Sequence, residues 1–449
     1  MMPTFVLVVF LVAYIGFALF SERRSWIAVG AALLLVLSGA IAANAGLSGG
    51  WAVRAAAGFR YAFAGADGAA PLVNWNVMGL FFGMLVLAEL FLESKAPAVI
   101  AEAMLSRFSS ARTAMIALCA LAGLISIGVE NVAVVLLFAP IALALAKKLD
   151  TSPVPLLIGI SICSNVQGTA TMIGDPPSMI LAGEMKMGFF DFFIYHGRLG
   201  IFFAVEVGAI VSLLVLGFFF RRHRGAFQLA GREKARSWTP TVLLAILVAG
   251  LCASSVIDPD FTWFAGTLTM TMGLLGFLWN AFSAKWIPPK KLFRSLDWDT
   301  TAFLIAVFIL VGGLSESGWL ESLAGYLSGR VGGSLAMAFI VFVALSTVIS
   351  GFVDNVPFLL AMIPVVRQVA SQMAAVSPHG EETLLFGLLI GACMGGNLTP
   401  IGASANVTTL GILRKNGTPA GFRDFMKISL PFTLAAVVGS ALFVWLVWA

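Results

Sequence analysis

Long apolar runs, separated by short polar segments, dominate the chain. A helix that crosses the hydrocarbon core of a bilayer needs about 20 predominantly apolar residues. Runs of this kind predict spanning helices near residues 4–20, 26–45, 75–93, 200–220, 239–257, 262–283, 298–314 and 428–448. The pattern therefore predicts an all-α polytopic membrane protein. We expect the first run to be an uncleaved span rather than a signal peptide, because no basic segment precedes it.

Four further apolar segments are interrupted in the middle. Glu130-Asn131 divides residues 113–147, and Asp354-Asn355 divides residues 335–371. Each part is short for a separate span, so both segments are predicted to be re-entrant hairpins that enter and leave on the same side. Residues 155–185 and 384–412 contain Gly/Pro-rich breaks and are predicted to be broken helices. Short amphipathic helices are expected at 97–108 and 319–330.

These interruptions occur twice in the same order. The run GTATMIGDPP at 168–177 returns as GNLTPIGASA at 396–405. Two broken helices at matching positions of two halves are typical of the binding site of a secondary transporter. Five true spans per half is an odd number, which inverts the second half relative to the first. We therefore expect inverted repeats over 1–220 and 239–449, joined by a basic linker at 221–238.

The distribution of basic residues predicts the orientation. If the linker 221–238 is cytoplasmic, 21 of the 27 Lys and Arg fall on the cytoplasmic side, including Arg23 and Arg24. Both termini then lie outside, the hairpin 113–147 opens inward and the hairpin 335–371 opens outward. The sequence predicts an integral multi-pass protein of a bacterial or archaeal cytoplasmic membrane.

The composition of the chain limits the functions that it can have. The chain is 60% hydrophobic and 11% charged, with a mean hydropathy of +0.99. The net charge of +5 does not indicate nucleic-acid binding, because the basic residues lie in short loops. The four cysteines show no CxxC and no metal-ligand spacing. The sequence also shows no His/Cys cluster and no nucleophile elbow, so we expect no enzyme activity, no cofactor and no resident metal. Cys163 and Cys393 precede the two breaks, where a thiophilic solute would meet them.

The breaks supply polar groups at membrane depth. Helix ends expose free N–H and C=O groups, and glycine lets backbone approach a ligand closely. The predicted solute-binding residues are Asn131, Asn355, Ser164, Asn165, Gly168, Thr169, Thr171, Gly396, Asn397, Thr399, Ser404 and Asn406.

Three carboxylates lie in the breaks and are the predicted proton- or ion-coupling groups: Asp354, Glu130 and Asp175. An ionisable group at the bilayer centre costs roughly 3 kcal/mol or more and indicates a functional site. No Lys or Arg lies with them in the sequence. The structural alternative is that Asp175 caps the restarting helix and that the other two bond the hairpin backbone.

In order and spacing, these motifs resemble the arsenite permease (ArsB), NhaD and P-protein branch of the ion transporter superfamily, over roughly residues 70–430. The resemblance implies a homodimer in which a scaffold domain holds still while a transport domain moves as an elevator. It also implies coupling to protons or sodium, and a cytoplasmic ATPase as an optional partner. This branch more usually has Asp at the first hairpin tip, so Glu130 is a departure.

Three transport functions can be compared with the polar groups that the breaks supply. Neutral arsenous acid carries three hydroxyl donors that carboxylate and Asn oxygens can accept, which suits proton-coupled efflux of arsenite or antimonite. A sodium/proton antiporter fits the same oxygens equally well. Sulfate or dicarboxylate transport is disfavoured, because the acids would repel an anion with no Arg nearby. The residues alone do not distinguish arsenite or antimonite efflux from sodium/proton antiport, and the family resemblance favours arsenite.

Overall fold

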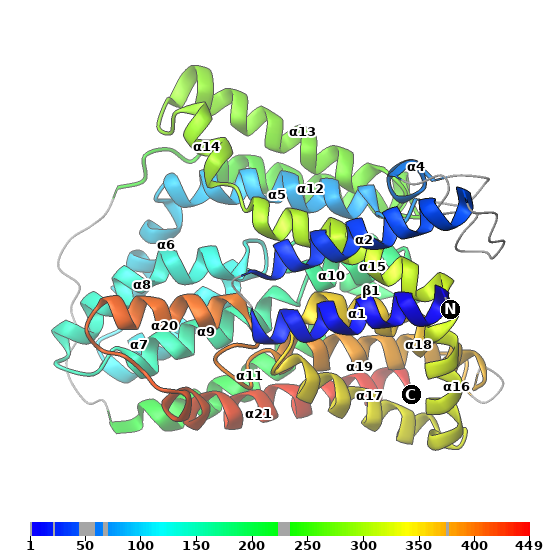
Figure 1. The fold of residues 1–449 in the computed structure, drawn as a ribbon. Coiled ribbons are helices and arrows are strands. Elements are labelled where there is room, and N and C mark those ends of the chain that lie inside the picture. Colours follow the sequence, from blue (N-terminus) through cyan, green and yellow to red (C-terminus); the bar gives the residue numbers. More distant parts are fainter. Residues whose placement is uncertain (1, 21–22, 45–58, 66–70, 223–233, 374–376) are drawn as a thin grey trace.

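Helices make up almost every segment that the structure describes. The computed structural model describes residues 2–20, 23–44, 59–65, 71–222, 234–373 and 377–449. Most helices run along one common direction, and both chain ends lie at the same end of the molecule (Figure 1). The predicted all-α class is confirmed.

The helices of the first half are α1 (Met2–Leu19), α2 (Arg24–Asn44), α4 (Phe59–Ala64), α5 (Trp75–Glu93), α6 (Ala96–Leu105), α7 (Ala111–Ser126), α8 (Asn131–Lys148), α9 (Val154–Gly168), α10 (Pro176–Met185) and α11 (Ile201–Phe219). Those of the second half are α12 (Thr239–Ile257), α13 (Phe264–Trp279), α14 (Pro289–Ser295), α15 (Trp298–Glu316), α16 (Trp319–Val331), α17 (Leu335–Ser350), α18 (Asn355–Ser371), α19 (Gly380–Gly395), α20 (Ser404–Lys415) and α21 (Phe422–Trp448). Short elements are η2 (Phe190–Phe192), η3 (Phe220–Arg222), the π-helical η4 (Asn280–Ala284), and the antiparallel strands β1 (Ile194–Tyr195) and β2 (Arg198–Leu199).

A helix occupies each of the eight uninterrupted spans that the sequence predicts. Among the described residues, six helices are long and apolar enough to cross a membrane on their own: α5, α8, α11, α12, α15 and α21. Helix α8 is the second part of the predicted hairpin 113–147, so the expectation that each part is short for a separate span is wrong for α8. Helix α21 begins at Phe422, earlier than the predicted 428, because the Asp424 carboxylate accepts the Gly421 N–H at 3.1 Å and caps the helix.

The helices are interrupted at the four positions that the sequence predicts. Helices α7 and α8 are separated at residues 127–130, and α17 and α18 at residues 351–354. Helices α9 and α10 are separated by residues 169–175, and α19 and α20 by residues 396–403. The helices from α5 to α11 thus correspond one by one, in order, to the helices from α15 to α21.

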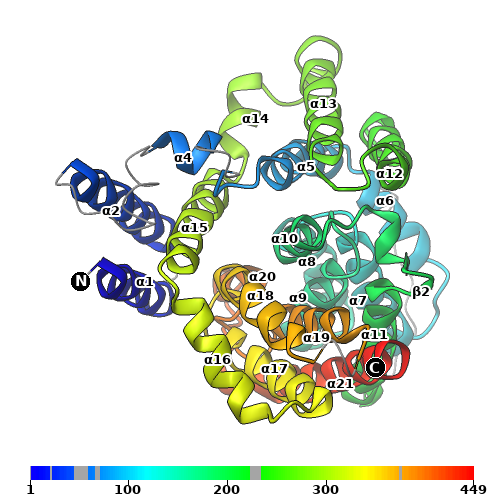
Figure 2. The same ribbon diagram turned by 90° about the vertical axis from the view of Figure 1, so that its right-hand side faces the viewer.

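The helices form two groups. Helices α12, α13, α5, α15, α2 and α1 contact one another in that order and form an arc (Figure 2). Helices α7–α11 and α17–α21 form a cluster beside it (Figure 2). Helix α15 contacts α18, and α5 contacts α8 and α10, so the arc meets the cluster at the hairpin and broken-helix elements.

The predicted linker 221–238 and the loop between α2 and α5 fall largely outside the described residues. At the described end of the linker, the Arg236 backbone N–H donates to the Ser94 carbonyl at 2.8 Å, and its guanidinium pairs with Glu93 at 3.1 Å. These contacts join the start of α12 to the end of α5.

Candidate functional site

The four non-helical segments that interrupt the helices converge on one cavity of about 70 Å³. It lies between the hairpin tips and the two broken helices, and the arc closes it from the other side. Seven of the residues predicted from the sequence line it: Glu130, Asn131, Asn165, Asp175, Asp354, Asn355 and Ser404. Residues far apart in the chain therefore contribute to a single site.

The two hairpin tips have the same construction. Glu130 is the N-cap of α8, and its carboxylate accepts the Ala133 N–H at 3.1 Å. Asp354 is the N-cap of α18, and its carboxylate accepts the Val356 N–H at 3.0 Å. The structural alternative for these two acids is thus observed, and it coexists with their position in the cavity. A carboxylate at a helix N-terminus is also stabilised by the positive end of the helix dipole.

Asp175 differs from the two tip acids. It precedes α10 at the N-cap position, but its side chain caps no backbone N–H of that helix. At the equivalent position of the second half stands Ala403, which also lines the cavity. The site therefore has three acids from the breaks rather than two symmetric pairs.

Behind the cavity, three Asn side chains join the two broken helices. The Asn165 amide donates to Asn397 Oδ1 at 2.7 Å and to Asn406 Oδ1 at 3.1 Å. Asn406 in turn donates to the carbonyls of Gly396 and Thr399 at 3.0 and 3.1 Å. Among the described residues, Asn165 Oδ1 is buried and has no hydrogen-bond partner, and Asn165 is one of the residues that line the cavity.

The predicted Thr residues support the hairpins and do not line the cavity. Thr171 donates to the Ile127 carbonyl at 2.6 Å, and Thr399 donates to the Gly351 carbonyl. Each break is thereby tied to the tip beside it. Thr169 bonds the Asn165 carbonyl at 3.4 Å within its own break. Ser164 donates to the Asn131 carbonyl at 3.3 Å and positions that residue from behind.

Glycines at the breaks allow backbone to approach backbone. A Cβ on Gly402 would lie 2.6 Å from the Gly396 carbonyl oxygen and 2.8 Å from that of Gly351. A Cβ on Gly174 would lie 2.7 Å from the Ser126 carbonyl oxygen. Both halves therefore pack a glycine of the break against the adjacent hairpin tip.

Gly402→Ala is expected to destabilise the protein by roughly 1–3 kcal/mol, the usual cost of overpacking, because the obstructing atoms belong to backbone. The matched control is Gly411→Ala within α20, where nothing lies within 4 Å of the added Cβ. This control should leave stability unchanged or slightly raised, since Ala is the better helix former. Thermal unfolding of both variants in detergent checks the prediction, and equal melting temperatures would contradict it.

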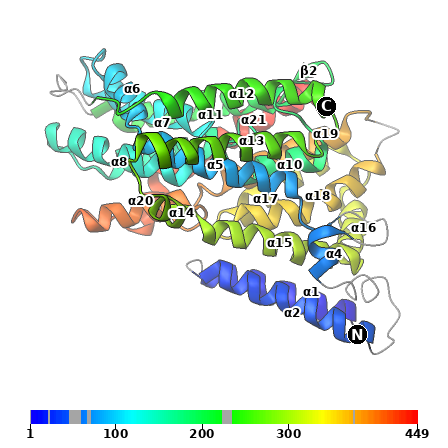
Figure 3. The same ribbon diagram turned by 90° about the horizontal axis from the view of Figure 1, so that it is seen from above.

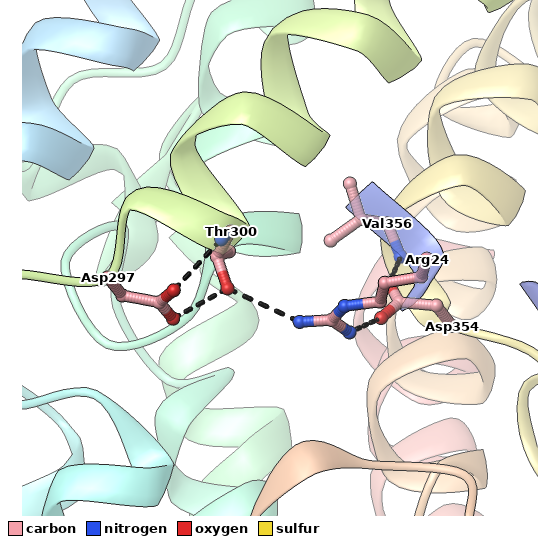
Figure 4. A network of polar contacts seen from close by, with 5 residues as sticks. All are labelled: Arg24, Asp297, Thr300, Asp354 and Val356. Carbon is pink, nitrogen blue, oxygen red and sulfur yellow. Dashed lines mark hydrogen bonds and ion pairs between the residues drawn. The ribbon is translucent and has the colours of Figure 1, made fainter. Parts of the chain in front are cut away.

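The structure corrects the expectation that no basic residue lies with the acids. The Arg24 guanidinium, at the start of α2, forms an ion pair with Asp354 (Figure 4). The guanidinium lies 4.9 Å from the centre of the Phe303 ring. It also donates to Thr300 Oγ1 at 3.3 Å. The side chains of Arg24 and Asp354 are only 17% and 16% exposed, so the pair is largely shielded from solvent.

Two further polar residues of the cavity, Asp297 and Thr300, come from the start of α15 and were not predicted from the sequence. Asp297 caps α15 by accepting the Thr300 N–H at 2.9 Å, and it accepts the Thr300 hydroxyl at 2.6 Å (Figure 4). The signal that could have located them is the repeated pair Trp75-Asn76 and Trp298-Asp299, which marks the start of a helix in each half.

A wider pocket of about 400 Å³ adjoins the cavity. The two share Arg24, Asp354 and residues 402–404. The ion pair therefore lies at the boundary between the enclosed cavity and the wider pocket. Of the two cysteines singled out from the sequence, Cys393 lines the cavity, whereas Cys163 is buried and is not among the lining residues.

Apolar helices of spanning length, combined with a polar cavity at the chain breaks, define an integral multi-pass membrane protein of the transporter class. The family model described as "Citrate transporter" matches residues 5–379 and 251–449. The chain belongs to the citrate transporter family.

Individual relatives agree with this class. An uncharacterized transporter of Mycobacterium tuberculosis is 29% identical over 386 residues, covering 83% of this chain and 86% of the relative. One of Synechocystis is 29% identical over 397 residues with the same coverage. The pig P protein is 25% identical over 449 residues, covering 81% of this chain and 52% of that protein, so the chain spans about half its length. The P-protein part of the predicted resemblance is thus supported, while the arsenite permease and NhaD part stays a prediction.

Solved structures share the fold. The Alcanivorax borkumensis YdaH transporter has a TM-score of 0.55 at 15% identity and covers 82% of this chain and 84% of its own. The Neisseria gonorrhoeae MtrF structure has a TM-score of 0.50 at 11% identity, with coverage of 93% and 94%.

Proposed function

We propose that this protein is a proton-coupled secondary active transporter that binds a small polar solute in the cavity between the two hairpin tips. The observation that carries the proposal is the convergence of Glu130, Asp175 and Asp354 on one cavity built from four chain breaks. Carboxylates that share a small cavity repel one another, so a proton or another cation stabilises them together. Solute movement can then be coupled to proton movement.

Arsenite or antimonite is the solute that we propose first. Four carboxylates and one guanidinium line the cavity, so acceptors for hydrogen bonds outnumber donors. Arsenous acid is neutral and supplies three hydroxyl donors, and the unpaired acceptor of Asn165 adds to the set. Cys393 gives this cavity one thiol. Sodium remains the alternative for the same oxygens.

A carboxylate anion is the second candidate solute, and Arg24 is the observation that favours it. Arg binds carboxylates through charge-assisted hydrogen bonds, and the family to which the chain belongs is described as citrate transporters. An organic acid would compete with Asp354 for the guanidinium. The argument against anions, that no Arg lies near the acids, no longer holds.

The architecture supports an elevator mechanism. We propose that the series α5–α11 and α15–α21 belong to inverted repeats over 1–220 and 239–449. In this proposal the arc is the scaffold, the cluster of α7–α11 and α17–α21 is the transport domain, and two copies assemble as a homodimer. The recurrence of the same elements in the same order supports it. A cytoplasmic ATPase partner remains a further proposal from the family resemblance.

The function is tested in proteoliposomes with an imposed pH gradient. Uptake of arsenite, antimonite, sodium, citrate and sulfate is measured side by side. We expect gradient-driven flux of arsenite or antimonite, and flux of citrate instead would favour the second candidate. Arg24→Gln separates these two outcomes, because it should abolish binding of an anion and leave binding of neutral arsenous acid measurable. If no solute responded to the gradient, proton coupling would be excluded.

The inverted topology predicts opposite accessibility for two exposed positions. A cysteine at Lys234, at the end of the linker, should react with a membrane-impermeant maleimide only after the membrane is permeabilised. A cysteine at Glu321, in α16, should react in intact cells. Both side chains are exposed, so reactivity reports the side of the membrane. Labelling of both positions from the same face would contradict the inverted arrangement.

A further inference from the structure

Two imidazoles and one carboxylate meet at a place that the proposed transport site does not use. His196 lies in the turn between β1 and β2, while His379 and Glu382 lie at the start of α19. Nδ1 of His196 is 3.3 Å from Oε1 of Glu382, and Nδ1 of His379 is 3.9 Å from the same oxygen. The three donor atoms all lie within 4.8 Å of one another. Strand β2 lies beside the C-terminus (Figure 3).

The donors of this cluster are available and reachable. Among the described residues, Nδ1 of His379 is buried and has no hydrogen-bond partner. The Glu382 side chain is 13% exposed, so its charge is largely desolvated, whereas His196 is 55% exposed and leaves an opening to solvent. A buried nitrogen without a partner is costly unless something binds it.

The two rings are also held in place by aromatic neighbours. His196 stacks on Tyr195 with 4.1 Å between ring centroids, and His379 meets Trp448 edge-on at 5.8 Å. Trp448 is itself anchored, because its indole N–H donates to the Leu199 carbonyl at 3.1 Å. The donor positions are therefore set by packing as well as by the backbone.

We propose that His196, His379 and Glu382 bind one divalent transition-metal ion, with zinc the ion that suits them best. Two His and one carboxylate form a recognised zinc donor set that leaves a fourth position for water. Bonds of about 2.0–2.1 Å in a tetrahedral site place donor atoms roughly 3.3 Å apart. The distance from His196 to Glu382 already matches this spacing, and a small rotation of His379 brings in the third donor. Magnesium and calcium, which prefer oxygen ligands, do not fit this set.

A bound ion would join segments of the two halves. The β1–β2 turn belongs to the connection between α10 and α11, and α19 leads into the break at 396–403. The site would therefore clamp the connection of one broken helix to the start of the other. This inference does not depend on which solute the protein transports.

The test is zinc titration of the full-length protein in detergent, after removal of metals with a chelator, by isothermal titration calorimetry. We expect one zinc per chain, and X-ray absorption spectra of the zinc-loaded protein should show two imidazole ligands. His196→Asn, which tolerates the positive φ of 46° at this turn, should weaken binding at least tenfold. His379→Gln and Glu382→Gln should do the same, since even outer-shell changes cost 10–100-fold at zinc sites.

Glu381→Gln is the matched control. This neighbouring carboxylate pairs with Arg367 at 3.0 Å rather than with the imidazoles. Its replacement should leave zinc affinity unchanged. The proposal is overturned if the wild-type protein binds zinc no more tightly than the His196→Asn/His379→Gln double variant, or if Glu381→Gln weakens binding as much as Glu382→Gln does.

Discussion

Replacing Asp354 by Asn is expected to reduce pH-gradient-driven transport to the background of empty liposomes while solute binding stays measurable. Asn keeps the size of the side chain and an oxygen that can accept the Val356 N–H, which Asp354 accepts at 3.0 Å. The cap of α18 is therefore retained. The variant can no longer exchange a proton, and it leaves Arg24 without the carboxylate that now pairs with it.

The measurement compares gradient-driven flux with equilibrium solute binding in the same preparation. Asp260→Asn is the control, because this carboxylate is exposed and forms a surface pair with Lys186 at 3.1 Å. Surface pairs of this kind contribute roughly 0–1 kcal/mol, so transport should be unaffected. Glu130→Gln should lower the flux as well or shift its pH optimum. Gradient-driven flux at the wild-type rate in Asp354→Asn would remove this residue from the coupling role and leave Asp175 as the next one to test.

The breaks could be predicted because their signals are local. Glu130 and Asp354 each interrupt an apolar segment of otherwise spanning composition, and both become helix N-caps in the structure. Acidic and short polar residues favour the N-cap because they accept N–H groups that have no partner within the helix. The preference acts over a few residues, so it can be read directly from the sequence.

Arg24 could not be assigned to the site from the sequence, because its partner lies 330 residues away. It follows an apolar run and precedes another, which is the pattern of a charged loop at a membrane surface. Its position in the cavity depends on α2 packing against α15 and on α15 packing against α18. Only tertiary contacts carry that information.

Local motifs also could not separate lining residues from supporting ones. Thr171 and Thr399 fall at matching positions of the two breaks, and both were predicted to bind solute. In the structure each donates to a hairpin carbonyl instead. A threonine hydroxyl satisfies a nearby backbone acceptor or a ligand with the same chemistry, so its role depends on which acceptor the fold brings near.

Arg24→Gln is expected to destabilise the protein by about 2 kcal/mol, between the values for exposed and for fully buried ion pairs. The intermediate value follows from side-chain exposures of 17% and 16%. Removing the guanidinium leaves the Asp354 carboxylate largely desolvated and without its cation. It also removes the bond to Thr300 at 3.3 Å, which ties α2 to α15. Arg23→Gln is the matched control, since Arg23 is the adjacent residue and is exposed.

The double variant Arg24→Gln/Asp354→Asn decides whether the pair itself is responsible. Two neutral amides can hydrogen-bond to each other, so the double variant should recover most of the stability that Arg24→Gln loses. Thermal unfolding of the wild type, both single variants and the double variant gives the coupling between the residues, because contacting residues show non-additive effects of about 0.5–3 kcal/mol. Additive losses, or an Arg24→Gln variant as stable as Arg23→Gln, would show that this ion pair does not hold the second hairpin tip to the arc. Additive stability losses would also imply that the Arg24 guanidinium can bind a solute anion at no cost from breaking its ion pair with Asp354.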